Sequence, residues 1–321
     1  MTRLRTPICD LFDIEVPIFL AGMGGVAYAE VCAAVSEAGG YGTLGMVGME
    51  PEEIRKEMRE VRRLTDRPFG VDLLAAIPDQ VFAAIDVIIE EGASSFIAGL
   101  GVPEAVIERC HASDVKVISM CGKVSHAVRA EQAGCDVVVA QGTEGGGHTG
   151  QVAGMALIPQ VVDAVGIPVL GAGAIVDGRG LTAALALGAQ GVWMGTRFIA
   201  SHEARAAEDY KKRITEIGSA DTVVTRCYSG KPMRVIANSY AEEMERRSEE
   251  IRPFPAQLSR SVEDGLMSVF IGETEGLTAE RSCMPAGQGS GGIDEVLPAG
   301  EIVRRVVDEA RQVIGKLGAL V

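Results

Sequence analysis

The chain has 321 residues, of which 47% are hydrophobic and 4% aromatic. This is enough for a large core in one barrel-sized domain with a smaller appendage. The formal net charge of −14, from 44 acidic and 30 basic residues, argues against nucleic acid or an anionic membrane as a partner. The seven scattered cysteines predict reduced thiols and no metal site. No apolar leader or bilayer-spanning stretch is evident, so a soluble, cytoplasmic protein is expected.

Short apolar runs alternate with helical patterns as far as Met194. The expected strands are Pro17–Leu20, Tyr41–Leu44, Phe69–Leu73, Ser95–Ala98, Val115–Ser119, Val137–Ala140, Pro168–Leu170 and Gly191–Met194. The expected helices between them are Ala27–Glu37, Glu52–Leu64, Asp79–Glu90, Pro103–His111, Val124–Ala133, Met155–Val165 and Arg179–Leu187. Many of these helices are followed by glycine, as is common where helices end.

Eight strands alternating with seven helices predict parallel βα units and an α/β fold. Their number favours a (β/α)8 TIM barrel over an open doubly wound sheet, whose glycine fingerprint is missing after the first strand. Residues 202–284 lack the alternation and are predicted to form an inserted helical substrate or lid domain. The apolar spacing of Ala299–Leu317 predicts the eighth barrel helix. The barrel is therefore expected to comprise residues 1–201 and 285–321.

The segment Val137–Gly150 is the strongest candidate for an active-site loop. An apolar strand leads into a loop with five glycines and one histidine, His148. Glycine allows backbone N–H groups to approach a flat or anionic ligand, and barrels build active sites where strands end. An imidazole also suits proton transfer near neutral pH. His148 is therefore the candidate catalytic residue, although a lone histidine can equally be a surface or packing residue.

Other polar residues have two interpretations each. His111, His126 and His202 are expected to be surface or packing residues, and Glu144 a solvated loop charge rather than a partner of the imidazole. Lys123 is either a cation near a cofactor or an ordinary helix-start lysine. Two glycine-containing strand ends, Gly171–Ala174 and Trp193–Thr196, either bind a phosphate or form tight turns.

Taken in order, these motifs resemble the nitronate monooxygenase family, also called 2-nitropropane dioxygenases. The same superfamily includes FMN-dependent enoyl-ACP reductases. The resemblance rests on AQGTEGGGHTG at 140–150, the stretch 167–198, PIFLAGMGG near the start, FGVDLL at 69–74 and AGQGSGGI at 286–293. It covers nearly the whole chain and is more specific for the superfamily than for a substrate.

The resemblance implies a TIM barrel that holds FMN at its C-terminal mouth, with His148 as the catalytic residue and no metal. The flavin contacts that carry over are Gly22, Met23, Asp72, Lys123, Gln141, Gly146, Gly147, Gly173, Ala174, Trp193, Met194, Gly195 and Thr196. Asp72 replaces the family's usual asparagine and, if ionised, would disfavour anionic reduced flavin. Ala174 replaces a second glycine and is expected to suit the site if its φ is negative.

The leading hypothesis is oxidation of an alkyl nitronate by O₂ through FMN, which gives a carbonyl compound and nitrite. A protonated or hydrogen-bonding His148 would hold the nitronate, or the imidazole would remove the α-proton of a nitroalkane. The second hypothesis is a reductase that uses NAD(P)H and acts on an enoyl-thioester, a quinone or a related acceptor. The third is a catalytically silent flavin-binding barrel with a partner-binding role. The oligomeric state stays open, a homo-oligomer included.

Overall fold

The computed structural model describes residues 4–74, 78–99, 101–271 and 278–320. Eight parallel strands follow one another in the order β1, β9, β8, β6, β5, β4, β3, β2. A bridge between Phe19 and Tyr41 brings β1 next to β2 and closes the barrel. The strands are β1 (Ile18–Leu20), β2 (Gly42–Gly45), β3 (Phe69–Leu74), β4 (Ser95–Gly99), β5 (Lys116–Cys121), β6 (Val137–Gln141), β8 (Val169–Ala172) and β9 (Gly191–Met194). The predicted TIM barrel is confirmed.

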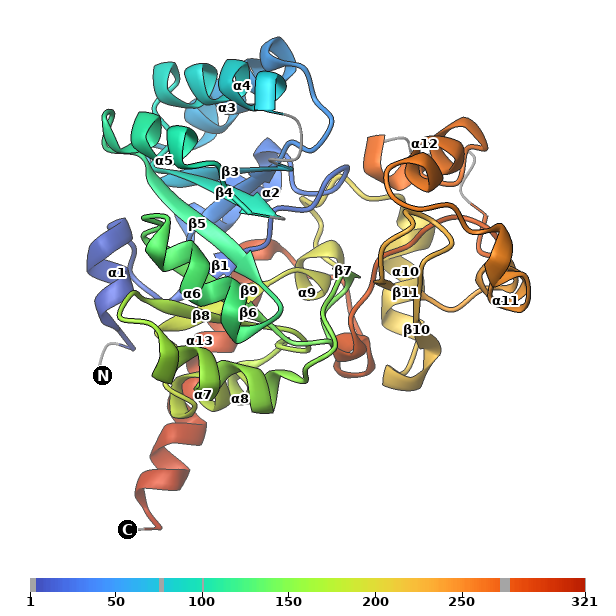
Figure 1. The fold of residues 1–321 in the computed structure, drawn as a ribbon. Coiled ribbons are helices and arrows are strands. Elements are labelled where there is room, and N and C mark those ends of the chain that lie inside the picture. The colour runs from blue at the N-terminus through green and yellow to red at the C-terminus, as the bar shows by residue number, and fades with distance from the viewer. Residues whose placement is uncertain (1–3, 75–77, 100, 272–277, 321) are drawn as a thin grey trace.

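The outer layer consists of helices that follow the strands (Figure 1). They are α2 (Ala29–Glu37), α3 (Pro51–Leu64), α4 (Pro78–Glu90), α5 (Glu104–His111), α6 (Val124–Gln132), α7 (Gly154–Ala164), α8 (Gly178–Ala186) and α13 (Ala299–Gly318). Helix α13 packs against α8 and α2 and so serves as the predicted eighth barrel helix. A side chain at Gly178 would clash there, because its Cβ would lie 2.2 Å from the backbone nitrogen of Ala310. None of the described helices is both long and apolar enough to cross a membrane.

Helix α3 shows how the outer layer is held. Pro51 starts the helix and the side chain of Glu53 accepts from the backbone N–H of Glu50. Ile54, Met58 and Val61, at spacings of four and three residues, are fully buried on the inner face.

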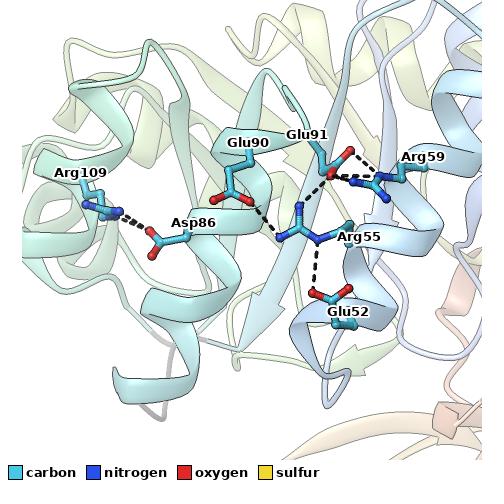
Figure 2. A network of polar contacts seen from close by, with 7 residues as sticks. All are labelled: Glu52, Arg55, Arg59, Asp86, Glu90, Glu91 and Arg109. Carbon is cyan, nitrogen blue, oxygen red and sulfur yellow. Dashed lines mark hydrogen bonds and ion pairs between the residues drawn. The ribbon is translucent and has the colours of Figure 1, made fainter.

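The outer face of α3 carries arginines that pair with acidic residues of α4. Arg55 contacts Glu90 at 2.8 Å and Glu91 at 2.7 Å, and Arg59 contacts Glu91 at 2.8 Å. Arg55 also pairs with Glu52 of its own helix. Figure 2 shows these contacts together with the ion pair that joins Asp86 of α4 to Arg109 of α5. These contacts form two separate groups, one between α3 and the end of α4 and the other between α4 and α5, and we call them together the α3–α5 ion-pair network.

The barrel interior below the mouth is filled by side chains. Phe19, Ile97, Ile118, Val139 and Leu170, among others, form one buried cluster. Helix α1 (Pro7–Phe12) adds its own buried residues to this cluster. The ring of Phe12 meets those of Phe19 and Tyr41 at centroid distances of 5.2 and 4.9 Å. The interior is therefore a packed core rather than a pore, and a ligand can enter only at the mouth.

The segment after β9 lies to one side of the barrel, at the right of Figure 1. It contains α9 (Thr196–Ile199), α10 (Glu208–Glu216), β10 (Thr222–Thr225), β11 (Met233–Ile236), α11 (Ser239–Arg246) and α12 (Ala256–Glu263). Short 3₁₀ turns occur at Ser219–Asp221, Ser248–Glu250, Ser268–Ile271 and Gln288–Gly292.

The prediction that residues 202–284 are helical is wrong for β10 and β11. These strands pair antiparallel, and β7 (Gly147–His148) from the glycine loop joins them as a third strand. Each strand has four residues or fewer, so its alternation is too short to detect in the sequence. The division of the chain at 202 and 284 stays a prediction, and residues 272–277 lie outside the described residues.

Candidate active site

A cavity of about 1300 Å³ opens where the barrel strands end. Its wall includes the predicted site residues His148, Gly22, Met23, Asp72, Lys123, Gln141, Gly146, Gly147, Gly173, Ala174, Trp193, Gly195 and Thr196. Met194 differs, because its side chain is buried in the core between the strands and the outer helices. Its backbone carbonyl accepts from the N–H of Ala21 at 2.8 Å, so Met194 supports the first loop of the mouth.

The position of His148 is fixed by the pairing of β7 with β11. His148 lies opposite Met233, and Gly147 opposite Arg234. The Arg234 side chain donates from Nε to the carbonyl of Thr143 at 2.9 Å, which ties β11 to the same loop. Gln141, at the end of β6, donates to the backbone carbonyl of His148 at 2.8 Å. The imidazole is therefore carried by backbone held from both the barrel and the insertion.

The imidazole of His148 has a partner that the sequence did not indicate. Its Nε2 lies 2.9 Å from the hydroxyl of Ser229, which is fully buried. The same hydroxyl donates its one hydrogen to the carbonyl of Lys231 at 3.2 Å. The hydroxyl must then accept from the ring, which places a proton on Nε2 and leaves Nδ1 as the basic nitrogen.

His148 is neutral near pH 7. Burial, together with the positive charge of Lys231, lowers the pKa of His148 to about 4. Lys231 also lines the cavity, and its ammonium lies 4.3 Å from the centre of the Phe254 ring. The geometry therefore favours His148 as a base or hydrogen-bonding group, with Lys231 as the positive charge nearby.

Asp72 stands at the end of β3 with its carboxyl against the first loop. A Cβ on Gly22 would lie 2.4 Å from Oδ2 of Asp72, so only glycine fits there. Burial raises the pKa of Asp72 well above its usual range. None of the described lysines or arginines forms an ion pair with it. Burial thus favours the protonated form of Asp72, which carries none of the negative charge that would disfavour anionic flavin.

Several backbone N–H groups on the cavity wall have no hydrogen-bond acceptor in the described part of the chain, among them two adjacent pairs, Gly173 with Ala174 and Gly195 with Thr196. The hydroxyl of Thr196 accepts from the N–H of Gly287 at 3.0 Å, so its own hydrogen is free to be donated. Unpaired donors of this kind suit a phosphate, and the polar side chains of Gln141 and Lys123 suit the edge of a heterocyclic ring. The residues present thus fit FMN.

The conformation of Ala174 is contrary to expectation. Its φ is +53°, in the left-handed region, and Gly173 before it has φ +106°. The expectation of a negative φ at Ala174 is wrong, because the turn that exposes these two N–H groups requires positive φ at both positions. An alanine in this region costs about 1–2 kcal/mol relative to its usual conformation, which accounts for the family's use of glycine.

One other prediction needs correction. Glu144 is not a solvated charge, because both its carboxylate oxygens accept from the N–H of Gly154, at 2.9 and 3.0 Å. It therefore anchors the glycine loop to the start of α7. His111, His126 and His202 are exposed, as expected. His126 also lines the cavity, whereas His111 and His202 have partners at Asp136 and the Val296 carbonyl.

The described residues offer no group of three or more histidine, cysteine, aspartate or glutamate side chains that could hold a metal ion. All seven cysteines are buried and free of disulfides.

The chain matches one protein family over most of its length. The family described as nitronate monooxygenase matches residues 5–84 and 75–309. A "Probable nitronate monooxygenase" of Staphylococcus saprophyticus is 36% identical over 301 residues, which covers 79% of this chain and 85% of the relative.

Two further relatives differ in name. A "(3aS,4S,5R,7aS)-5-hydroxy-7a-methyl-1-oxo-octahydro-1H-indene-4-carboxyl-CoA dehydrogenase" of Mycobacterium tuberculosis is 40% identical over 259 residues, covering 80% of this chain and 72% of the relative. The structure of FabK from Thermotoga maritima is 38% identical, with a TM-score of 0.91 and coverage of 99% of both chains. The chain belongs to the nitronate monooxygenase family of flavoprotein oxidoreductases.

Proposed function

We propose that this protein is an FMN-dependent oxidoreductase that oxidises alkyl nitronates with O₂ to a carbonyl compound and nitrite. The observation that carries the proposal is a neutral His148, held by Ser229 on the wall of the same cavity that presents unpaired backbone donors. FMN, when bound, supplies the two-electron chemistry that connects the substrate to O₂. Gly173, Ala174, Gly195 and Thr196 would hold its phosphate, and Gln141, Lys123 and Asp72 its ring edge.

Lys231 and His148 have the remaining roles in binding the substrate and transferring its proton. The ammonium of Lys231 offsets the negative charge of a bound nitronate. His148 donates a hydrogen bond from Nε2 to Ser229, which fixes the ring. When the substrate is a neutral nitroalkane, Nδ1 of His148 takes the α-proton. The packed barrel below the mouth excludes water from that side of the substrate.

The test uses purified protein with its flavin. The visible spectrum is recorded first, then again after anaerobic addition of the nitronate of 2-nitropropane, and finally after O₂ is admitted. The proposal expects the flavin to bleach with the nitronate, to recover with O₂ and to release nitrite. A flavin that stays oxidised and releases no nitrite contradicts the proposal.

A second candidate function is the reduction or dehydrogenation of a bulky thioester or quinone. The cavity of about 1300 Å³ exceeds the usual ligand pocket of roughly 300–1,000 Å³, so it has room for a substrate beside the flavin. Leu258 and Val262 of α12, with Met267 and Val269, add apolar side chains to its wall. The name of the Mycobacterium tuberculosis relative points to an acyl-CoA substrate for that protein.

The two candidates are separated by their response to a reduced nucleotide. NADH or NADPH added anaerobically should bleach the flavin quickly in a reductase and leave it unchanged in a strict nitronate oxidase. Nitrite release, measured on the same preparation, decides for the first function. Rapid bleaching without nitrite release decides for the second.

A further inference from the structure

Three basic side chains extend the cavity beyond the catalytic histidine. Lys123, His126 and Arg129 follow one another at intervals of three residues along α6, and all three line the cavity. Residues three apart on a helix share a face, so this row lies along one wall. We call these residues the α6 cations.

The α6 cations have no carboxylate partner in the residues that the structure describes. Arg129 donates only to the carbonyl of Ser125 on its own helix, at 3.2 Å. Partial burial, together with the positive charges of Arg129 and Lys123, lowers the pKa of His126 below its usual value, so near neutral pH the positive charge of this row lies on Lys123 and Arg129 and His126 serves as a hydrogen-bonding group. The charges therefore act on one another without a neutralising acid between them.

The arginines of the neighbouring outer helices differ in this respect, because acidic partners hold those of the α3–α5 ion-pair network. Lys123 and Arg129 keep their positive charges without such a partner, and an anionic ligand would be attracted to them.

The facing wall leaves room for such a ligand. Helix α5 does not pack closely on α6 in the described structure, whereas α3 packs on α4 and α6 on α7. Figure 1 shows the two helices standing apart on either side of β5. Gly101, Val102 and Glu104 line the cavity on the α5 side. Glu104 contributes one carboxylate against the two positive charges of Lys123 and Arg129, so the groove keeps a positive balance.

We infer that the α6 cations form a subsite for the phosphate groups of a nucleotide-bearing substrate whose reacting end enters the cavity at His148. Guanidinium and ammonium groups are the usual protein partners of phosphate. The inference rests on the proposed flavin-dependent function, because it takes the cavity at His148 as the place of reaction. Two substrates share this chemistry: a coenzyme A thioester and a nicotinamide dinucleotide.

The experiment compares ligand binding to flavin-loaded wild-type protein and to the double variant His126→Gln/Arg129→Gln. Lys123 is left intact because it also belongs to the proposed flavin site. The matched control is Arg109→Gln on α5, which removes a similar charge but pairs with Asp86 and does not line the cavity. Coenzyme A, NADH and NADPH are titrated separately by calorimetry at low and high salt.

We expect at least one of the three probes to bind the wild type, and its dissociation constant to rise about tenfold or more in the double variant. The control should bind that probe as the wild type does, and added salt should weaken wild-type binding more than binding to the double variant. Binding of coenzyme A alone identifies a thioester, and binding of NADH or NADPH alone identifies an electron donor.

The inference is overturned if the wild type binds none of the probes, or if the double variant binds as tightly as the wild type. Unchanged flavin absorbance and circular dichroism in the double variant show that it has folded and kept its flavin. Nitrite release is measured on the wild type only. A wild type that binds coenzyme A through the α6 cations but releases no nitrite therefore contradicts the nitronate proposal and leaves the subsite intact.

Discussion

The basic side chains of α3 and α5 and those of α6 differ in whether they have carboxylate partners. In the α3–α5 ion-pair network, Arg55, Arg59 and Arg109 each meet at least one carboxylate (Figure 2). On α6, Arg129 lines the cavity and has no carboxylate partner among the residues that the structure describes. Its charge is therefore available to a ligand in the cavity, whereas the paired charges of the network join helices. The comparison separates residues that stabilise the fold from residues that serve the cavity.

The largest expected effect comes from the cavity side. His148→Gln removes the basic nitrogen but keeps a polar group of similar reach, so kcat should fall by about 10²–10⁴-fold. Flavin absorbance should be retained, because His148 is not one of the proposed phosphate contacts. Steady-state nitrite release and the visible spectrum measure the two effects. Turnover that survives in the variant would mean that His148 is not the base.

On the acid side, enzyme activity should decline only at an unusually low pH. The basic form of His148 is needed, and its pKa is about 4 rather than 6.5. The rate with a nitroalkane should therefore stay level from pH 8 to about pH 5 and decline only as the pH approaches 4. A pH profile of kcat/KM checks this, and a decline centred near pH 6.5 would contradict the neutral, buried imidazole.

The same shift makes stability depend on pH. The unfolded chain binds a proton on His148 below about pH 6.5, and the folded chain only near pH 4, so acid favours unfolding between these values. The size is roughly 3 kcal/mol, from 1.36 kcal/mol per pKa unit. The raised pKa of Asp72 has the opposite sign, because stability falls as the pH rises from its unfolded value through its folded one.

Denaturant unfolding of the wild type and His148→Gln, at pH 7.5 and 4.5, isolates the contribution of His148. The variant should lose less stability on acidification than the wild type. Equal losses in the two proteins would show that His148 titrates normally.

A crossed pair of substitutions tests the comparison itself. Arg55→Gln should lower the midpoint of thermal unfolding, because Glu91 is only 15% exposed and would lose a partner. Its binding of nucleotide probes should not change. Arg129→Gln should show the reverse pattern, with weakened binding and an unchanged midpoint. Calorimetry and thermal unfolding give both readouts, and an effect of both substitutions on the same property would remove the distinction.

The smallest expected effect concerns Ala174. Replacement by glycine relieves about 1–2 kcal/mol of left-handed strain and costs about 0.4–1 kcal/mol through the freer unfolded chain. A net gain of about 0.5 kcal/mol in the free energy of unfolding is expected from denaturant titration. A loss of stability would mean that the turn tolerates alanine without strain.

The barrel could be predicted from the sequence because its signals are local. Each predicted strand and outer helix has a counterpart within a few residues, since apolar runs, helix-start prolines and terminal glycines act over one element. The glycine loop and His148 were found for the same reason.

The supports of His148 could not be predicted, because they depend on contacts between distant segments. Ser229 is 81 residues away from His148 along the chain. The strands that bring Ser229 there, β10 and β11, are too short to be recognised in the sequence. The register of β11 against the glycine loop is fixed only by its pairing with β7. Glu144 was misjudged because the role of a loop side chain depends on which segment packs against it, here the start of α7.

Because β7 of the glycine loop pairs with β11, residues 202–284 cannot be exchanged between family members independently of the loop that carries His148. A chimera that takes residues 202–284 from a relative would also replace the strand that sets the height and angle of the imidazole. A change of substrate preference through residues 202–284 therefore also requires that the pairing of β7 with β11 is kept. A chimera whose new β11 shifted this register by one residue would be inactive even if it bound its ligand well.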